Sequence, residues 1–415
     1  MNNYKTNCPL IWPRAILLVD MNAFFASIEQ LDFAYLQGQP VAVTNGEQGS
    51  CIITCSYEAR RYGVKTGMRL YEARERCPTL IQRAARPKRY AQLSRLIMRA
   101  LEAITPDIEV YSVDEAFLDL THCQRLHGTP LHIARITQTL IKEVSQLPCS
   151  IGVSGNKTMA KYAAKIKKPN GITIVPPWEA KAWLEHVPVT ELCGIASGVK
   201  RFLARYNVVT CGDMKRLPVS VLAQRFGHVG RRIWMMCQGE DSEPLNIAMP
   251  PPKSMGHGKV LPPNTKNREV LLTYFQHMSE KLAERLRTHE MQAQHFFIGL
   301  RCRSIGWLGG KYYLSTPSDD GKLFFELCEI VLNHCWQGEG VHQVQITALD
   351  PRHKEEQSDF FSLESNDALH HVVDSINHRY GRLTVCSARL IRRSSMPDVI
   401  PPAWKAEGVR QVIDD

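Results

Sequence analysis

Two acidic residues lie side by side inside an apolar stretch of the chain, the sequence VYSVDEAFLDL at residues 110–120. The apolar side chains of this stretch predict a buried strand, whereas the charges of Asp114 and Glu115 are stable in water. An ionised carboxylate that is buried without a partner costs several kcal/mol of folding free energy. Any fold of this chain must therefore bring a cation or hydrogen-bond donors to these two acids.

A third acid, Asp20, follows the apolar residues 15–19, which predict another buried strand. Functional groups of α/β sheets typically lie at the carboxyl ends of strands. Carboxylates with no histidine or thiol ligand nearby are hard oxygen donors, which suit Mg²⁺ or Mn²⁺ better than zinc. Two such ions can stabilise both the attacking and the leaving oxygen of phosphoryl transfer. The residues alone leave a second interpretation open, in which Asp114 and Glu115 lie on an exposed turn.

The length and composition of the chain limit its class. A chain of 415 residues is too long for one hydrophobic core and predicts about two to four domains. No apolar run approaches the ~20 residues of a membrane span, and the first residues resemble no signal peptide, so we expect a cytoplasmic protein. The 13 cysteines are scattered without a C-x-x-C pair, which argues against a zinc site and a disulfide framework.

The positive charge of the chain is concentrated in its first part. Residues 1–177 hold 22 basic and 14 acidic side chains, whereas residues 243–350 hold 11 of each. The densest basic stretch, residues 60–99, contains 12 basic side chains and only two acids. This local excess favours nucleic acid or phosphates as a partner. A solvated basic surface is the alternative, and charge alone does not separate the two.

The order of expected elements predicts several domains. Strands expected at residues 15–19, 41–44, 52–54 and 149–154 alternate with helices at 94–104, 132–144 and 156–168, which indicates an α/β or α+β domain. Short helices follow and predict a separate α domain. The proline-rich stretches 249–256 and 261–265 resemble a linker. A helix at 270–287 and strands at 295–303, 311–316 and 341–349 then predict a small α+β domain, and one more helix is expected at 368–379.

Four motifs are specific enough to indicate a family: LLVDMNAFFASIEQ, SYEARRYGVKTGM, YSVDEAFLDL and SIGVSGNKTMAKYAAKIKKPNG, in this order. Together they resemble the Y-family translesion DNA polymerases of the bacterial polymerase IV class, over residues 14–350. The resemblance implies an α+β multidomain, right-hand polymerase fold. Its expected parts are a palm (1–21 and 86–177), fingers (22–85), a helical thumb (178–242), a linker (243–255), a little-finger α+β domain (256–350) and a tail (351–415).

The resemblance also implies a function and its cofactors. The enzyme would be a monomer that binds primer–template DNA and dNTPs and extends the primer 3′-hydroxyl with low fidelity. Asp20, Asp114, Glu115 and the main-chain carbonyl of Met21 would bind two Mg²⁺ ions, for which Mn²⁺ could substitute. Phe25 would be the steric gate that excludes a ribose 2′-hydroxyl. The alternative for Phe25 is a core side chain.

Other motif positions correspond to substrate contacts in the family. Thr54, Tyr57, Arg60 and Lys168 would contact the incoming triphosphate. Lys157, Lys161 and Lys165 follow each other at four-residue spacing and repel each other unless an anion lies alongside, or else they form a solvated face. The segment LCGIASGVKRFL resembles a helix-hairpin-helix motif, in which Gly194 and Ala196 would bind a DNA phosphate; Ala196 replaces the usual glycine.

Two further segments complete the predicted contacts. In FFIGLRCRS the residues alternate, so that Arg301 and Arg303 would face away from the core and toward DNA. The peptide QSDFF, with Gln357, Phe360 and Phe361, resembles the motif by which such polymerases bind the sliding clamp. The alternative function is a non-catalytic relative that recruits partners to damaged DNA. A P-loop is excluded because Asn156 separates Gly155 from Lys157.

Overall fold

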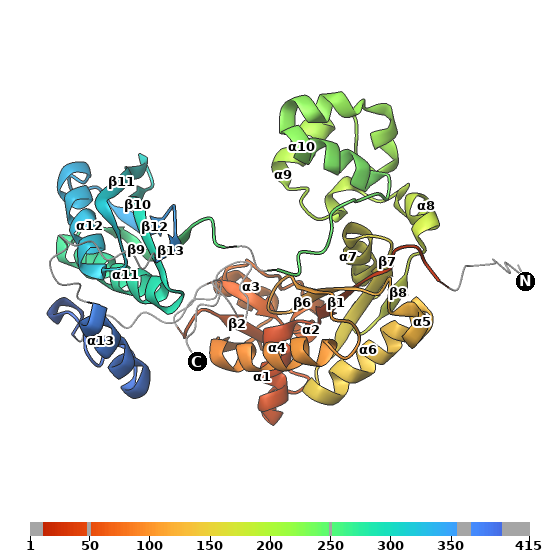
Figure 1. Ribbon diagram of the computed structural model, residues 1–415, viewed down its shortest axis with the longest axis horizontal. Helices are drawn as coiled ribbons and strands as arrows, with labels where there is room; N and C mark the ends of the chain where they lie inside the picture. Colours follow the sequence, from red (N-terminus) through yellow and green to blue (C-terminus); the bar gives the residue numbers. More distant parts are fainter. Residues whose placement is uncertain (1–10, 48–50, 249–250, 355–366, 392–415) are drawn as a thin grey trace, which may run out of the picture. The chain divides into compact units, whose positions relative to one another are not determined.

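The computed structural model describes residues 11–47, 51–248, 251–354 and 367–391 (Figure 1). Two compact units divide near residue 249. The first contains a five-stranded sheet, a three-stranded sheet and a helical region, and the second contains another five-stranded sheet, in which β13 pairs with β10, and its helices. Gln357, Phe360 and Phe361 lie outside the described residues.

The five-stranded sheet of the first unit has the strand order β5-β6-β1-β7-β8. The middle strand β1 pairs with β6 and β7, both antiparallel. The strands are β1 (Ile16–Met21), β5 (Ile108–Val110), β6 (Glu115–Asp119), β7 (Cys149–Ser154) and β8 (Ile172–Ile174). The helices around the sheet are α4 (Pro87–Leu101), α5 (Gln124–His127), α6 (Pro130–Ser145) and α7 (Lys157–Ile166).

Helices cover both faces of this sheet, which explains why β1 is apolar from Ile16 to Val19. Leu17 and Val19 belong to the core that α4 and α6 complete, whereas Leu18 packs with Ala160 and Ala164 of α7. On the α7 side the helix approaches β7 very closely. A Cβ atom on Gly152 would lie 2.1 Å from the carbonyl oxygen of Ala160, so only glycine fits there.

The three-stranded sheet, in the order β3-β2-β4, has a separate small core. Its elements are α1 (Phe24–Asp32), η1 (Ala34–Leu36), β2 (Val41–Thr44), β3 (Ile52–Cys55), α2 (Tyr57–Arg61), α3 (Leu70–Arg76) and β4 (Ile81–Ala84). Strand β4 was not predicted. Helix α4 also begins earlier than the predicted residue 94, because Pro87 is favourable in the first turn of a helix.

The helical region consists of short helices around one core, as expected. They are η2 (Pro177–Glu179), α8 (Ala180–Leu184), η3 (Val189–Glu191), α9 (Ser197–Ala204), η4 (Gly212–Arg216) and α10 (Val219–Cys237). Gly227, with φ of 61°, interrupts α10. Asn207 has φ of 54°, a left-handed conformation that asparagine tolerates.

The second unit contains a sheet in the order β11-β10-β12-β9. Phe296 of β10 packs against Phe324 of α12, with 4.7 Å between ring centroids, so the helices cover the face of β10 that carries Phe296. The elements are β9 (Met255–Thr265), α11 (Arg268–Thr288), β10 (Met291–Cys302), β11 (Gly306–Ser318), α12 (Gly321–Cys335), β12 (Val341–Ala348), β13 (Arg352–His353), α13 (Asp367–Tyr380) and η5 (Ala388–Leu390).

Two elements of this unit differ from the sequence prediction. Residues 261–265, expected in a linker, belong to β9, which tolerates proline because it is an edge strand. Helix α12 was not predicted. The predicted final helix corresponds to α13, which Arg287 of α11 binds through its Nε and Nη2 atoms, 2.6 and 2.8 Å from the carboxylate of Asp374.

Candidate active site

Three carboxylates meet at one end of the five-stranded sheet of the first unit. Asp20 of β1 and Glu115 of β6 lie directly opposite each other in the antiparallel pair. Asp114 immediately precedes β6, and its carbonyl oxygen accepts a hydrogen bond of 2.9 Å from the backbone N–H of Met21. The strand pairing thus brings together two acids that are far apart in the sequence. The exposed-turn interpretation is wrong for this cluster, since Asp20 is buried and the other two acids are partly buried.

Each acid has a partner, as the sequence required. The ammonium of Lys168 lies 2.5 Å from Oδ2 of Asp20. The ammonium of Lys161 lies 2.9 and 2.7 Å from the two carboxylate oxygens of Glu115. Asp114 accepts a hydrogen bond of 2.6 Å from the hydroxyl of Ser112. Two lysines therefore bind two of the three acids, whereas the third acid, Asp114, is bound by a hydroxyl.

This shortage of positive charge changes the acidity of the cluster. The pKa of Asp20 is raised to about 6, mainly by burial and also by the charges of Glu115 and Asp114, although Lys168 lowers it. Burial also raises the pKa of Asp114, with a contribution from Glu115 that exceeds that of Lys161. An additional cation would relieve the repulsion among these carboxylates.

A cavity of about 360 Å³ opens beside the cluster. It brings together nearly all residues that the sequence predicted for the metals and the triphosphate. Its lining is Asp20, Met21, Ala23, Phe24, Phe25, Ile53, Thr54, Arg60, Thr66, Asp114, Glu115 and Lys168. Tyr57 does not line the cavity. Its ring lies 4.7 Å from the guanidinium of Arg60, and the Nε of Arg60 donates to the Cys55 carbonyl at 3.2 Å.

Phe25 lies in the wall of the cavity and in the core at the same time. Its ring stacks on that of Tyr90, with 4.5 Å between centroids and 16° between planes. Tyr90 is fully buried and donates a hydrogen bond of 2.8 Å to Oε1 of Glu29. This support for Phe25 was not predicted, because a tyrosine on the apolar face of a helix has no distinguishing sequence pattern.

The donors at the cluster fit hard divalent cations. They are carboxylate oxygens and a main-chain carbonyl, and the side-chain nitrogen atoms that bond Asp20 and Glu115 belong to lysines. Among the described residues, no group of three or more His, Cys, Asp and Glu is arranged to hold a metal ion. Asp20 and Glu115 bind lysines instead.

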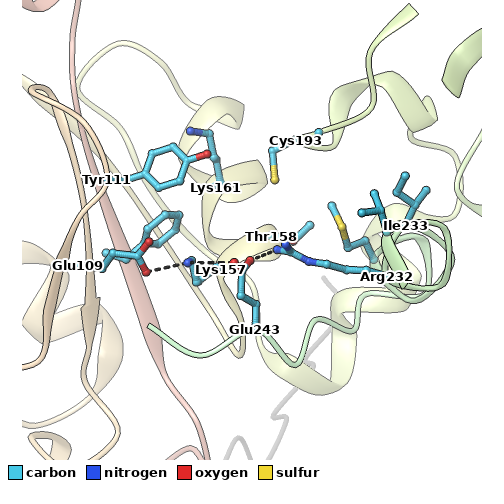
Figure 2. A pocket seen from close by; sticks show the side chains of 13 residues that line it. Glu109, Tyr111, Lys157, Thr158, Lys161, Cys193, Arg232, Ile233 and Glu243 are labelled. Carbon is cyan, nitrogen blue, oxygen red and sulfur yellow. Dashed lines mark hydrogen bonds and ion pairs between the residues drawn. The ribbon is translucent and has the colours of Figure 1, made fainter. Parts of the chain in front are cut away.

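The solvated-face interpretation is wrong for Lys157 and Lys161, whereas Lys165 is exposed. Lys157 is buried and lies 2.7 Å from Glu109, and Lys161 binds Glu115. Lys165 donates to the carbonyl of Glu191 at 2.8 Å. Lys157 and Lys161 line a second cavity of about 220 Å³ between α7 and the helical region (Figure 2).

The residues predicted to bind DNA lie in both units. Gly194 has φ of 82°, and Ala196 is the N-cap residue of α9. The interruption of α10 at Gly227 was not predicted, although the G-x-x-G spacing in FGHVG is a signal for it. In the other unit Arg301 is exposed on β10, with its guanidinium 5.8 Å from the Trp307 ring. Arg303 follows the end of that strand.

The chain is similar to known DNA polymerases. Residues 19–165 match the impB/mucB/samB family, and residues 252–360 match the C-terminal domain of that family. The sequence is 32% identical to a DNA polymerase IV of Moorella thermoacetica over 378 residues, which covers 89% of this chain and 94% of the relative. It is 31% identical to a DNA polymerase IV of Bacillus anthracis over 377 residues, covering 89% and 91%.

A solved structure has the same fold. The Y-family DNA polymerase chimera Dbh-Dpo4(243-245)-Dbh superimposes with a TM-score of 0.71 at 24% identity, over 82% of this chain and 100% of the chimera. Within the described ranges no helix has the length and apolarity that a membrane span requires.

Proposed function

Since the chain belongs to the Y-family DNA polymerases of the polymerase IV class, we propose that the cavity beside Asp20, Asp114 and Glu115 is its nucleotidyl-transfer site. The chain is a translesion DNA polymerase, so its substrates are a DNA template and dNTPs. Within this fold we assign the five-stranded sheet of the first unit to the palm, the three-stranded sheet to the fingers, the helical region to the thumb and the sheet of the second unit to the little finger.

The convergence of the three acids at the cavity is the observation that supports this site best. Polymerases of this family generally use divalent metals, and here Asp20, Asp114, Glu115 and the Met21 carbonyl would hold two Mg²⁺ or Mn²⁺ ions. When bound, these ions lower the negative charge on the reacting phosphate and favour ionisation of the primer hydroxyl. The three acids and the carbonyl fix the position at which that hydroxyl and the α-phosphate meet.

The opposite wall of the cavity suits the triphosphate. Arg60 presents a guanidinium fork to phosphate oxygens, and its Nε–H···O=C bond to Cys55 holds the side chain in place. Thr54 adds a hydroxyl donor. Lys168 reaches the same cavity from the palm, so it can exchange Asp20 for a phosphate. Tyr57 acts through Arg60, whose guanidinium it contacts.

Phe25 determines sugar selectivity in this proposal. Its ring lines the cavity and is fixed from behind by Tyr90, so it cannot move away from a ribose 2′-hydroxyl. Phe25→Ala should raise incorporation of ribonucleotides relative to deoxynucleotides by at least about tenfold. Competition between dNTP and rNTP in single-nucleotide extension measures this ratio, and an unchanged ratio would refute the gate.

The DNA contacts lie in the thumb and the little finger. Gly194 and Ala196 would present backbone N–H groups to one phosphate, and the interruption at Gly227 would bind another. In the part of the chain that the structure describes, one face of the little-finger sheet is not covered by the helices. On this face four residues of neighbouring strands are paired with one another across the sheet: Gly258, Gln345, Gly299 and Gly309. Arg301 and Trp307 form the next pair on the same face. Small residues beside an arginine suit close approach of a DNA backbone.

The QSDFF peptide is proposed to bind the sliding clamp through Gln357, Phe360 and Phe361, and the enzyme is proposed to act as a cytoplasmic monomer. Gel filtration of the chain with and without a purified clamp tests both points. Co-elution should be lost when Phe360 and Phe361 are both replaced by alanine.

Primer extension tests the proposed function directly. The full chain is given a primed template and one dNTP at a time, with Mg²⁺ or with chelator. We expect addition only of the template-matched dNTP and only with the metal. DNA binding without any addition would instead support a non-catalytic recruiting protein.

A further inference from the structure

Lys161 contacts Glu115 from the side that the nucleotide does not use. Its ammonium bonds both carboxylate oxygens, at 2.9 and 2.7 Å, and both side chains are largely buried. Lys161 does not line the cavity assigned to the nucleotide, but it lines the second cavity behind it. Lys168, in contrast, lines the nucleotide cavity, where a phosphate can replace Asp20 as its partner. Lys161 therefore needs a different explanation.

The Lys161 ammonium has a second partner within the same cavity. Its Nζ lies 4.4 Å from the centroid of the Tyr111 ring, a cation–π contact that remains if the bond to Glu115 breaks. Figure 2 shows Lys161 beside Tyr111, with Cys193 across the cavity. Tyr111 is 41% exposed, so an ammonium at this ring also has access to water. The cavity of about 220 Å³ leaves room for the movement.

We propose that Lys161 is the resident counter-ion of Glu115 and that a divalent metal displaces it toward Tyr111. This inference rests on the proposed function, because it assumes that Glu115 is a metal ligand. An ammonium that holds both oxygens of a carboxylate competes directly with a metal for that carboxylate, and its positive charge also repels the metal. The lysine stabilises the buried acid before the metal arrives and thereby weakens metal binding. Lys161 is thus a positioning residue that sets the metal affinity.

Metal binding without DNA tests the inference. The full chain is titrated with Mn²⁺, and free Mn²⁺ is followed by its electron paramagnetic resonance signal. Lys161→Met should bind Mn²⁺ about tenfold more tightly than the wild type, because a competitor and a positive charge are both lost. Lys165→Met is the matched control: it makes the same change one helical turn away, where the partner is a main-chain carbonyl, and should leave the affinity unchanged. Lys161→Arg keeps the charge and should also leave it unchanged.

A purely structural role for Lys161 predicts the opposite sign. If Lys161 merely holds Glu115 in place, Lys161→Met binds Mn²⁺ equally or more weakly, and that result overturns the inference. Tyr111→Leu provides a second test that leaves the Lys161–Glu115 bond intact. It removes the partner that the displaced ammonium would keep and should weaken Mn²⁺ binding about threefold; unchanged or tighter binding contradicts the proposal.

Failure of the inference can be separated from failure of the proposed function. Glu115→Gln should weaken Mn²⁺ binding if Glu115 is a metal ligand at all. If Glu115→Gln has no effect, the metal assignment is wrong, and the inference fails with it. If Glu115→Gln weakens binding while Lys161→Met does not tighten it, the metal assignment stands and only the role of Lys161 is overturned.

Discussion

Two clusters of buried and partly buried acids in the first unit differ in how many positively charged side chains bind them. We call Asp20, Asp114 and Glu115 the palm cluster, and Glu29 and Asp32 of α1 the α1 cluster. The palm cluster has two lysine partners for three acids. In the α1 cluster three arginines bind two acids: Arg83, Arg86 and Arg89.

The hydrogen bonds of the α1 cluster are also more complete. The fully buried Glu29 accepts hydrogen bonds from Arg83, Arg86 and Tyr90, at 3.2, 2.8 and 2.8 Å. Hydrogen bonds from Arg89 and Arg86 lower the pKa of Asp32, whereas burial raises the pKa of Asp20 to about 6. An acid cluster with surplus cations is a structural element, whereas one with a deficit of cations is prepared to bind another positive charge.

The largest expected effect comes from Asp114→Ala in the palm cluster. Single-nucleotide turnover should fall about 10³- to 10⁴-fold, because a metal ligand is lost. The thermal unfolding temperature should not fall, since the change removes a buried charge that repels its neighbours. Turnover close to wild type would contradict the assignment of Asp114, and DNA affinity measured in parallel confirms that the substrate still binds.

Glu29→Ala should have the reverse pattern. Removing the buried Glu29 leaves Arg83 without its carboxylate, Arg86 with Asp32 alone and the buried Tyr90 hydroxyl without its acceptor, at a cost of about 4 kcal/mol in the free energy of unfolding. Urea denaturation monitored by circular dichroism measures this loss. Turnover by the protein that remains folded should stay within about tenfold of wild type, because Glu29 contacts no residue of the palm cluster. A loss of turnover as large as that of Asp114→Ala would remove the distinction between the clusters.

The clusters should also give opposite pH dependence of stability in chelator. The pKa of Asp20 is about 6 in the folded chain and 3.8 as its ordinary value, so the unfolded chain loses this proton first as the pH rises. As the pH rises from about 4 to about 6, the ionisation of Asp20 therefore lowers the free energy of unfolding by up to about 3 kcal/mol. Asp32 has a lowered pKa, so its stabilisation is present above its ordinary pKa and is lost as the pH falls.

Unfolding free energies at several pH values check this prediction. Asp20→Asn should remove the decrease between pH 4 and pH 6, whereas Asp32→Asn should reduce the loss of stability at lower pH. If Asp20→Asn leaves the pH profile unchanged, Asp20 does not titrate as its surroundings indicate.

The sequence predicted the palm cluster but not the α1 cluster, for a physical reason. Asp20, Asp114 and Glu115 border apolar strands, so the cost of burying them is visible in the local pattern. Glu29 lies in a helix where an exposed glutamate is equally compatible with the sequence, and its arginine partners are more than 50 residues away. Such long-range pairing follows from the fold and leaves no local signal.

The same distinction explains the errors in the fold. The apolar strands of the palm were predicted because helices bury both of their faces. Strand β9 was expected in a linker, because its prolines weaken the strand pattern and only its edge position makes them acceptable. Likewise, the sequence showed four-residue spacing for Lys157, Lys161 and Lys165. It did not show that the acids facing Lys157 and Lys161 come from β5 and β6.

The smallest expected effect lies where the clusters are linked, at Tyr90, which stacks on Phe25 of the cavity and donates to Glu29 of the α1 cluster. Burial and the charge of Glu29 raise the pKa of Tyr90, so its hydroxyl remains a donor at neutral pH. Tyr90→Phe keeps the ring and removes one hydrogen bond of Glu29, which should cost about 1 kcal/mol in the free energy of unfolding. Sugar selectivity should not change. Tyr90→Leu removes the stacked ring as well, so ribonucleotide incorporation should rise. If both variants show the same sugar selectivity, the exclusion of ribonucleotides by Phe25 does not depend on the Tyr90 ring that stacks on it.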